Sequence, residues 1–424
     1  MRDETLAIHG GYAADGARAA AVPIYQTVAH EFIDADHAGA IMDLEQPGFH
    51  YNRINNPTVD VLERRLAALE GGAAAMAVSS GAAAVSMSVL NLVSAGDNFV
   101  SVPQLYGATY TYFAHVLSRM GIEARFAADD SPRAIGDLID QRTKLVFCET
   151  VGNPAGNVID LAAVADVAHA HGVPIIADNT VATPLLLKPL RHGADVVVHS
   201  LTKFIGGHGT TMGGMIVDGG TFDWREHPDR FPLMVEPEPA FHGVQYAEQF
   251  AHAPYITRAR TVGLRNTGAS LSPFNAFLHL QGLETLAVRL ARHEANARAV
   301  AEHLVGDSRV TSVSFLGLAD NPYHELARRY LGERVPSIMT FTVSGGRDAG
   351  IAVFNSVKLF KRLLNMGDAK SMITHPASTT HRQLRPAELA AAGITPDMVR
   401  LSVGLEHPDD LIEDLDQALT RAVG

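Results

Sequence analysis

The chain contains almost no cysteine and no long hydrophobic run. Cys148 is the single cysteine among 424 residues, which excludes an intramolecular disulfide and a cysteine-based metal site. Because it follows Leu145-Val-Phe, we expect its side chain to be buried as a small apolar group. No apolar run reaches the roughly 20 residues of a membrane-spanning helix, and residues 1–7 lack the hydrophobic region of a signal peptide. We therefore expect a cytoplasmic protein without a membrane partner.

Positive charge is also scarce. The sequence has 34 lysines and arginines against 46 aspartates and glutamates, a net charge of −12, and no basic block. This balance argues against nucleic acid and anionic membranes as partners. Hydrophobic residues make up 47% of the chain, which is typical of a globular protein, and the length allows two or three domains.

The order of helix and strand signals predicts an α/β fold. A helix is expected to begin at Asn56-Pro57, where an N-cap residue precedes a proline, and to end at Gly71-Gly72. Short apolar strands then alternate with helical segments. The strand candidates are residues 75–78, 98–102, 124–127, 145–148, 173–177 and 196–199. Such alternation predicts a mostly parallel sheet covered by helices.

Changes in pattern divide the chain into three parts. Residues 1–56 have no clear helical or strand period, and we expect this N-terminal arm to lie against a neighbouring subunit. Residues 57–265 carry the alternating pattern. Near residue 266 long helices begin, with the best signal over residues 283–304, and residues 266–424 are expected to form a smaller C-terminal α/β domain.

The residues that follow the strands carry the candidate chemistry, because ligands of parallel sheets bind at the carboxyl ends of strands. Ser200-Leu-Thr-Lys203 follows the strand at 196–199. A desolvated lysine loses affinity for its proton and is suited to forming a Schiff base. Ser200 and Thr202 could donate to a phosphate oxygen. Taken alone, the same pattern is also compatible with a strand-to-loop transition and an exposed lysine.

Asp178 and the Ser80-Gly81-Ala82 segment give two further indications. Asp178 ends a buried strand, where a carboxylate is costly unless it is paired, and a pyridinium N–H would pair it. Gly81 and Ala82 begin a helix after a strand, and free backbone N–H groups at such a start bind phosphate. The alternatives are a helix-capping aspartate and a plain turn capped by Ser80.

Two other strand ends carry an aromatic and an amide. Tyr106 could stack on a planar cofactor ring, or could be an ordinary core tyrosine. Asn153 could reach a ring hydroxyl, or could belong to a turn before Pro154. A lysine, an aspartate, a phosphate cradle and an aromatic on one sheet edge together fit pyridoxal 5′-phosphate.

Other common cofactors lack their motifs. The sequence has no Gly-x-x-x-x-Gly-Lys-Ser/Thr phosphate loop, and the glycine run at 206–213 does not have the dinucleotide spacing. There is no His-Glu-x-x-His pair. No metal ligands are therefore predicted, and the four histidines considered for that role are His199, His208, His375 and His381.

These stretches resemble the Cys/Met-metabolism family of pyridoxal-phosphate enzymes over essentially the whole chain. The matching segments are Tyr51-Asn-Arg53, Ser80-Gly81, Leu105-Tyr-Gly107, Asp178-Asn-Thr-Val-Ala-Thr-Pro184, Ser200-Leu-Thr-Lys203, His375-Pro-Ala-Ser378 and Arg400-Leu-Ser-Val-Gly-Leu-Glu406. The resemblance implies a fold-type I transferase with pyridoxal phosphate on Lys203, which would also move protons.

The resemblance also implies roles for the other residues. Asp178 would pair with the ring nitrogen and Tyr106 would stack on the ring. Gly81, Ala82, Ser200 and Thr202 would hold the phosphate, and Tyr51 and Arg53 would reach the phosphate site of the neighbouring subunit. Arg400 would bind the substrate α-carboxylate as a fork, assisted by Asn153 and Asn365. Two positions depart from relatives: Ala108, where methionine γ-lyases carry cysteine, and Ala82, where many carry a larger apolar residue.

Within the family, the segments 199–209, 236–243, 365–371 and 376–381 resemble the branch that uses O-acetyl-L-homoserine and sulfide. The implied reaction is a γ-replacement giving homocysteine and acetate in methionine biosynthesis, by a homo-oligomer that is at least a dimer and is expected to be a dimer of dimers. The alternatives are an O-succinylhomoserine sulfhydrylase, a cystathionine γ-synthase or γ-lyase, and, most remotely, a non-enzymatic pyridoxal-phosphate-binding protein.

Overall fold

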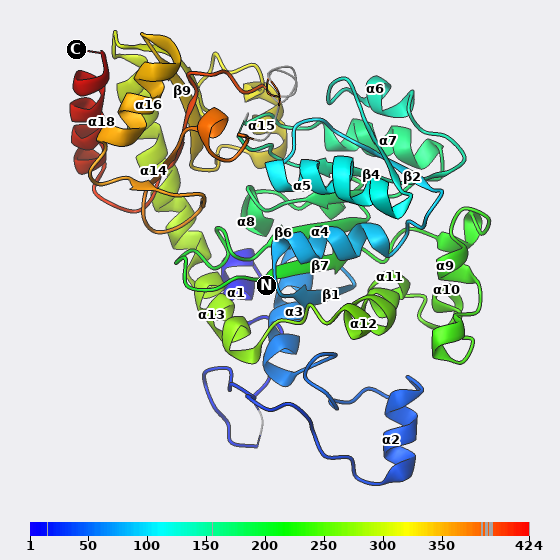
Figure 1. Ribbon diagram of the computed structural model, residues 1–424. Coiled ribbons are helices and arrows are strands. Elements are labelled where there is room, and N and C mark those ends of the chain that lie inside the picture. The colour runs from blue at the N-terminus through cyan, green and yellow to red at the C-terminus, as the bar shows by residue number, and fades with distance from the viewer. Residues whose placement is uncertain (15, 155, 383–384, 386–388, 390–392, 424) are drawn as a thin grey trace.

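The structure is a computed structural model that describes residues 1–14, 16–154, 156–382, 385, 389 and 393–423. Figure 1 shows a large sheet with helices around it and a smaller domain, with α14, α16 and α18, beside it. The helices are α1 Asp3–His9, α2 Ala35–Met42, α3 Pro57–Glu70, α4 Gly81–Leu90, α5 Gly107–Thr111, α6 Pro132–Gly136, α7 Leu161–Ala170, α8 Thr183–Leu186, α9 Pro232–Val235, α10 Tyr246–Gln249, α11 Pro254–Arg258, α12 Arg265–Thr267, α13 Pro273–Glu284, α14 Leu286–Val305, α15 His324–Leu331, α16 Gly346–Ser356 and α18 Pro408–Val423.

The large sheet has seven strands in the order β1-β7-β6-β5-β4-β2-β3. Their bounds are β1 Ala74–Val78, β2 Asn98–Ser101, β3 Glu123–Phe126, β4 Thr143–Glu149, β5 Ile175–Asp178, β6 Val196–Ser200 and β7 Gly214–Asp218. The five strands from β3 to β6 in this order are mutually parallel, and β7 runs antiparallel to β6 and β1. The prediction of a mostly parallel sheet is therefore confirmed.

The first helix of the large domain begins and ends where its sequence predicts. The side chain of Asn56 accepts hydrogen bonds from the N–H groups of Thr58 and Val59, and Pro57 is the first helical residue. Gly71 ends α3 with a φ of 79°, a left-handed conformation that glycine adopts at little cost. α3 packs against β1 and β7, and α4 packs against β1, β6 and β7.

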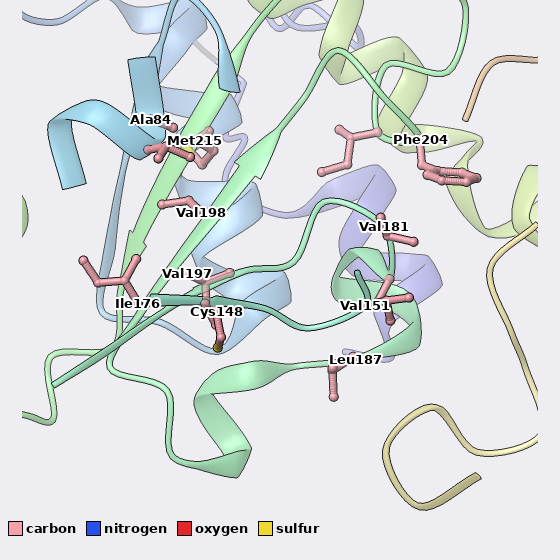
Figure 2. Packing of buried hydrophobic residues seen from close by; sticks show 14 of the residues in the cluster. Ala84, Cys148, Val151, Ile176, Val181, Leu187, Val197, Val198, Phe204 and Met215 are labelled. Carbon is pink, nitrogen blue, oxygen red and sulfur yellow. The ribbon is translucent and has the colours of Figure 1, made fainter. Parts of the chain in front are cut away.

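The central strands are buried because helices cover the sheet. Every residue of β4 is buried, as are the apolar residues of β5 and β6. Figure 2 shows Cys148, Ile176, Val197, Val198 and Met215 among the packed side chains of this core. Cys148 is fully buried, and this burial raises the pKa of its thiol to about 12, so the prediction of an inert, packed cysteine is confirmed.

The C-terminal domain is built on a five-stranded sheet in the order β10-β11-β12-β9-β8. Its strands are β8 Val310–Ser314, β9 Ile338–Val343, β10 Lys361–Arg362, β11 Met372–Thr374 and β12 Val399–Ser402. The helix expected over residues 283–304 corresponds to α14, which begins at Leu286 after a break, because α13 ends at Glu284. Thr285 lies at the break, and its hydroxyl donates to the carbonyl of Gly282.

The N-terminal segment contains helices that its sequence did not reveal. α1 packs against α3 and α13 of its own chain, and the buried Arg65 donates from Nε to the carbonyl of Gly10. The first residues therefore pack on their own subunit, and the expected contact of the arm with a neighbouring subunit stays a prediction. The helix α1 was not predicted because seven residues are too few to show a helical period. The rest of the segment, with α2, extends away from the large sheet (Figure 1). Among the described residues, no helix combines the length and apolarity needed to cross a bilayer.

Candidate active site

A cavity of about 510 Å³ lies at the carboxyl ends of β4, β5 and β6, where the large domain meets the C-terminal domain. It contains ten of the residues that the sequence singled out. They are Gly81, Ala82, Tyr106, Asn153, Asp178, Ser200, Thr202, Lys203, Asn365 and Arg400. Strand order explains the convergence of the eight that end or follow strands of the large sheet, because neighbouring parallel strands deliver the residues after them to one edge, whereas Asn365 and Arg400 come from the C-terminal domain.

Lys203 is held in the cavity just after β6. Its Nζ donates to Oδ1 of Asn365 at 2.7 Å. Burial, together with the nearby charge of Arg400, lowers the pKa of Lys203 to about 8. A larger fraction of this amine is therefore neutral near pH 7 than of an exposed lysine, which favours attack on a carbonyl carbon.

Asp178 is partly buried at the end of β5 and has no cationic partner of its own among the described residues. One carboxylate oxygen accepts from the N–H of Thr180 at 2.9 Å. Burial raises the pKa of Asp178, whereas the bonds from Thr180 and the charge of His199 lower it. A protonated ring nitrogen would supply the missing cation.

The start of α4 offers free backbone N–H groups of the kind that bind a phosphate group. Ser80 caps the helix by accepting from the N–H of Ala83, and no hydrogen bond of the N–H groups of Gly81 and Ala82 occurs within the described chain. A Cβ added at Gly81 would lie 2.5 Å from Cβ of Ser200, so only glycine permits this approach. The N–H of Ser200 in turn donates to the hydroxyl of Thr180 at 2.8 Å.

Arg400 enters the opposite side of the cavity from β12. It is buried, and burial lowers its pKa to about 10. Nη1 donates to Oδ1 of Asn153 at 2.9 Å, while Nη2 donates to the carbonyl of Asn365 and the hydroxyl of Thr374. Its buried Nε has no partner among the described residues, so part of the guanidinium fork is left for a carboxylate.

Several polar residues of this site were not predicted. Glu149 and Thr180 line the cavity, and Thr374 orients Arg400. The signal for Glu149 and Thr180 was present, because both follow buried strands, but neither residue type points to one function. Thr374 belongs to β11, and only the pairing of β11 with β12 reveals it.

Tyr51 and Arg53 do not reach this cavity within one subunit. Arg53 lies over the Tyr51 ring at 5.3 Å and donates to the carbonyl of Arg265. Both residues line a second pocket, of about 570 Å³, together with α2 and residues 240–242. In the part of the chain that the structure describes, Arg53 forms no salt bridge, and its proposed role in a neighbouring site stays a prediction.

The loop at 231–242 lies away from the large cavity in the single subunit. None of its residues lines the large cavity, and Ala240, Phe241 and His242 line the second pocket. Phe231 and Met234 are buried in the core, which holds the loop away. Arg258 and Arg265 also lie outside the cavity, because Arg258 donates to Asn91 and Arg265 stacks on Phe241.

The donor set fits pyridoxal phosphate. A buried carboxylate suits the ring nitrogen, a lysine of lowered pKa suits the aldehyde, and the Gly81 cradle suits the phosphate. Tyr106, 45% exposed, lies on the wall of the same cavity, where its ring could stack on the cofactor.

Comparisons with known proteins agree with this fit. The family model described as Cys/Met metabolism PLP-dependent enzyme matches residues 4–420. A homocysteine synthase of Schizosaccharomyces pombe is 47% identical over 98% of this chain and 97% of its own. An O-acetyl-L-homoserine sulfhydrylase of Thermus thermophilus is 45% identical over 99% of this chain and 100% of its own.

A solved structure extends the match to three dimensions. The crystal structure of an O-acetylhomoserine (thiol)-lyase, assigned as such only provisionally, from Campylobacter jejuni has a TM-score of 0.96 and 42% identity. The match covers 99% of this chain and 100% of that one, whose cofactor is joined to a lysine. The chain described here therefore belongs to the family of pyridoxal-phosphate-dependent enzymes of cysteine and methionine metabolism.

Proposed function

We propose that this enzyme converts O-acetyl-L-homoserine and sulfide to L-homocysteine and acetate. In this γ-replacement the bond between Cγ and the ester oxygen breaks, a bond between Cγ and sulfur forms, and acetate leaves. The names of the two curated relatives and of the solved structure support this reaction.

The chain's own residues supply binding and proton transfer. Bound pyridoxal phosphate stabilises negative charge at the substrate Cα. Arg400 binds the α-carboxylate through its free donors, with Asn153 holding the guanidinium in place. Lys203, once released from the cofactor, is positioned to take the Cα proton at Nζ and to return a proton later, because a lowered pKa suits a general base near neutral pH.

The charge of the cavity lining is the observation that carries the choice of ester. Among the described residues, Lys203 and Arg400 are the only cationic residues in the lining. Lys203 is already assigned to the cofactor and Arg400 to the substrate α-carboxylate. The remaining wall is rich in apolar side chains, among them Val85, Val151, Val181, Met212, Leu364 and Met366. A succinyl ester would bring a second carboxylate without a partner, which costs several kcal/mol when buried, whereas an acetyl group is neutral.

A product assay tests the proposal. Purified holoenzyme is incubated with O-acetyl-L-homoserine and either sulfide or cysteine, and homocysteine, cystathionine and 2-oxobutanoate are measured. Homocysteine as the main product, made only with sulfide, is the expected result. Cystathionine made with cysteine would favour a γ-synthase, and 2-oxobutanoate made without any acceptor would favour a γ-lyase. Lack of turnover with every acylated homoserine would favour a binding protein.

The assembly that fits this function is a cytoplasmic homo-oligomer, at least a dimer and expected to be a dimer of dimers. Two features support a shared site: the extended segment after α1 and the exposed pair Tyr51 and Arg53, which lies outside its own cavity. Arg53 would bring a positive charge to the phosphate of the neighbouring subunit.

A further inference from the structure

Glu149 is a buried carboxyl group that the reaction itself does not use. It is the last residue of β4, is 6% exposed and lines the cavity. Its Oε1 accepts a hydrogen bond from the N–H of Tyr106 at 2.6 Å, and its carboxyl group also accepts from the N–H of Asn153. One side chain therefore joins two loops that leave neighbouring strands of the sheet.

Each of these loops carries one wall of the site. Tyr106 follows β2 and lines the cavity, while Asn153 follows β4 and accepts a hydrogen bond from Nη1 of Arg400. β4 pairs with β5 so that Glu149 lies opposite Asp178. Glu149 thus contacts the ring-stacking loop and the carboxylate-binding loop beside the residue assigned to the ring nitrogen.

The Tyr106 loop has few other anchors. The side chain of Tyr106 is 45% exposed, so packing alone does not fix it. Tyr106 precedes α5, a helix of only five residues without a side-chain cap, and the backbone continues into a π-helix at Tyr112–Val116. The hydrogen bond from the N–H of Tyr106 to Glu149 is therefore well placed to fix the position of the tyrosine ring.

We infer that Glu149 is a positioning residue, whose acceptor oxygens fix Tyr106 and the Asn153–Arg400 pair relative to the cofactor. This role concerns how the enzyme holds pyridoxal phosphate, and it is independent of which ester or sulfur donor the enzyme uses. Burial raises the pKa of Glu149 well above its ordinary value, and the negative charge of Asp178 raises it further. A neutral carboxyl group still accepts hydrogen bonds and leaves Asp178 as the single negative charge for the ring nitrogen.

Replacing Glu149 with glutamine or with methionine distinguishes the effect of its acceptor oxygens from the effect of its side-chain shape. Glu149→Gln keeps a neutral acceptor oxygen at the same length, whereas Glu149→Met fills a similar space without one. A matched control is Asp414→Ala in α18, because Asp414 is also buried and accepts from three backbone N–H groups, those of Lys358, Leu359 and Phe360. It lines none of the described pockets.

The holoenzymes are compared by visible circular dichroism of the bound cofactor, by the dissociation constant of pyridoxal phosphate, and by kcat and KM. We expect Glu149→Met to lose most of the dichroism and about 100-fold in kcat/KM, the scale of a catalytic group misplaced by about 1 Å. The kcat/KM of Glu149→Gln should stay within about threefold of the wild-type value. Asp414→Ala should lower thermal stability only. The dichroism and cofactor affinity need no substrate, so they test this inference even where the sulfide assay fails.

Two results would overturn the role. If Glu149→Met keeps the dichroism and kcat/KM of wild type, the contact positions nothing. If Glu149→Gln is as impaired as Glu149→Met, an ionised carboxylate is required and positioning by an acceptor is wrong. Should Glu149→Met fail to fold, Glu149→Asp replaces it: that variant keeps the charge but withdraws the oxygens, so impairment supports positioning and wild-type values contradict it.

Discussion

The Nζ of Lys203 donates a 2.7 Å hydrogen bond to Oδ1 of Asn365, a residue 162 positions later in the chain. Lys203 follows β6 of the large sheet, whereas Asn365 lies between β10 and β11 of the C-terminal sheet. The contact therefore crosses from one sheet to the other, and the state of the lysine depends on how the C-terminal domain docks.

Lys203→Ala should abolish both turnover and the visible absorption of the bound cofactor. The physical reason is that Lys203 is the single amine in the described part of the cavity lining, and without it no covalent bond to the cofactor forms. Absorption spectra and a homocysteine assay on the purified protein check this. Lys370→Ala is the control, because Lys370 is largely exposed and pairs with Asp368 outside the cavity. A Lys203→Ala protein that keeps both properties would remove Lys203 from the mechanism.

The capture of pyridoxal phosphate by the apoenzyme should depend on pH with a midpoint near the lysine pKa. Burial lowers the pKa of Lys203 from 10.5 to about 8. Only the neutral amine attacks the aldehyde, so the capture rate should rise with pH and level off above about pH 8. Stopped-flow absorbance measures the rate. Arg400→Met should move the midpoint upward, since the charge of Arg400 also lowers this pKa, and a rate still rising steeply at pH 10 in wild type would contradict the assignment.

Arg400→Lys should weaken substrate binding while leaving the cofactor bound. A lysine keeps the charge but cannot replace the fork that contacts Asn153, Thr374 and the substrate carboxylate. A lost charge-assisted hydrogen bond corresponds to about 1.5–3 kcal/mol, or roughly 10- to 100-fold in KM. Steady-state kinetics and the absorption spectrum check this, with Arg362→Lys on exposed β10 as control. An unchanged KM would place carboxylate binding elsewhere.

Mixed subunits should restore activity that neither variant has alone. Arg53→Ala removes the side chain that is proposed to reach the neighbouring site, and Lys203→Ala removes the amine of its own site. In a randomly mixed symmetric dimer, about one quarter of the sites would combine an intact Lys203 with an intact Arg53. The variants are mixed by denaturation and refolding, hybrids are verified by differential tags, and homocysteine formation is measured. Verified hybrids without activity would show that the site is not shared in this way.

The acetyl ester should be preferred over the succinyl ester. Both cations of the described cavity lining already have roles, and an unpaired second carboxylate would be buried beside apolar side chains. kcat/KM with sulfide is compared for O-acetyl- and O-succinyl-L-homoserine. A clear preference for the succinyl ester would reveal a cation that a partner subunit brings into the site.

Local sequence patterns determined the large sheet and the positions of the cofactor residues. Apolar strands, the Asn56 cap and the glycine at position 71 act over a few residues, so the chain itself encodes them. The general rule that parallel strands bind ligands at their carboxyl ends then placed Gly81, Tyr106, Asp178 and Lys203 together, and the cavity contains all four.

Tertiary structure decided the contacts that join distant segments. The bond from Lys203 to Asn365, the bonds from Glu149 to Tyr106 and Asn153, and the packing of α1 on α3 follow from how the layers dock. The same docking buries Phe231 and Met234, which keeps the loop at 231–242 away from the cavity. Such contacts depend on the geometry of whole strands and helices, and no local pattern of residue types encodes that geometry.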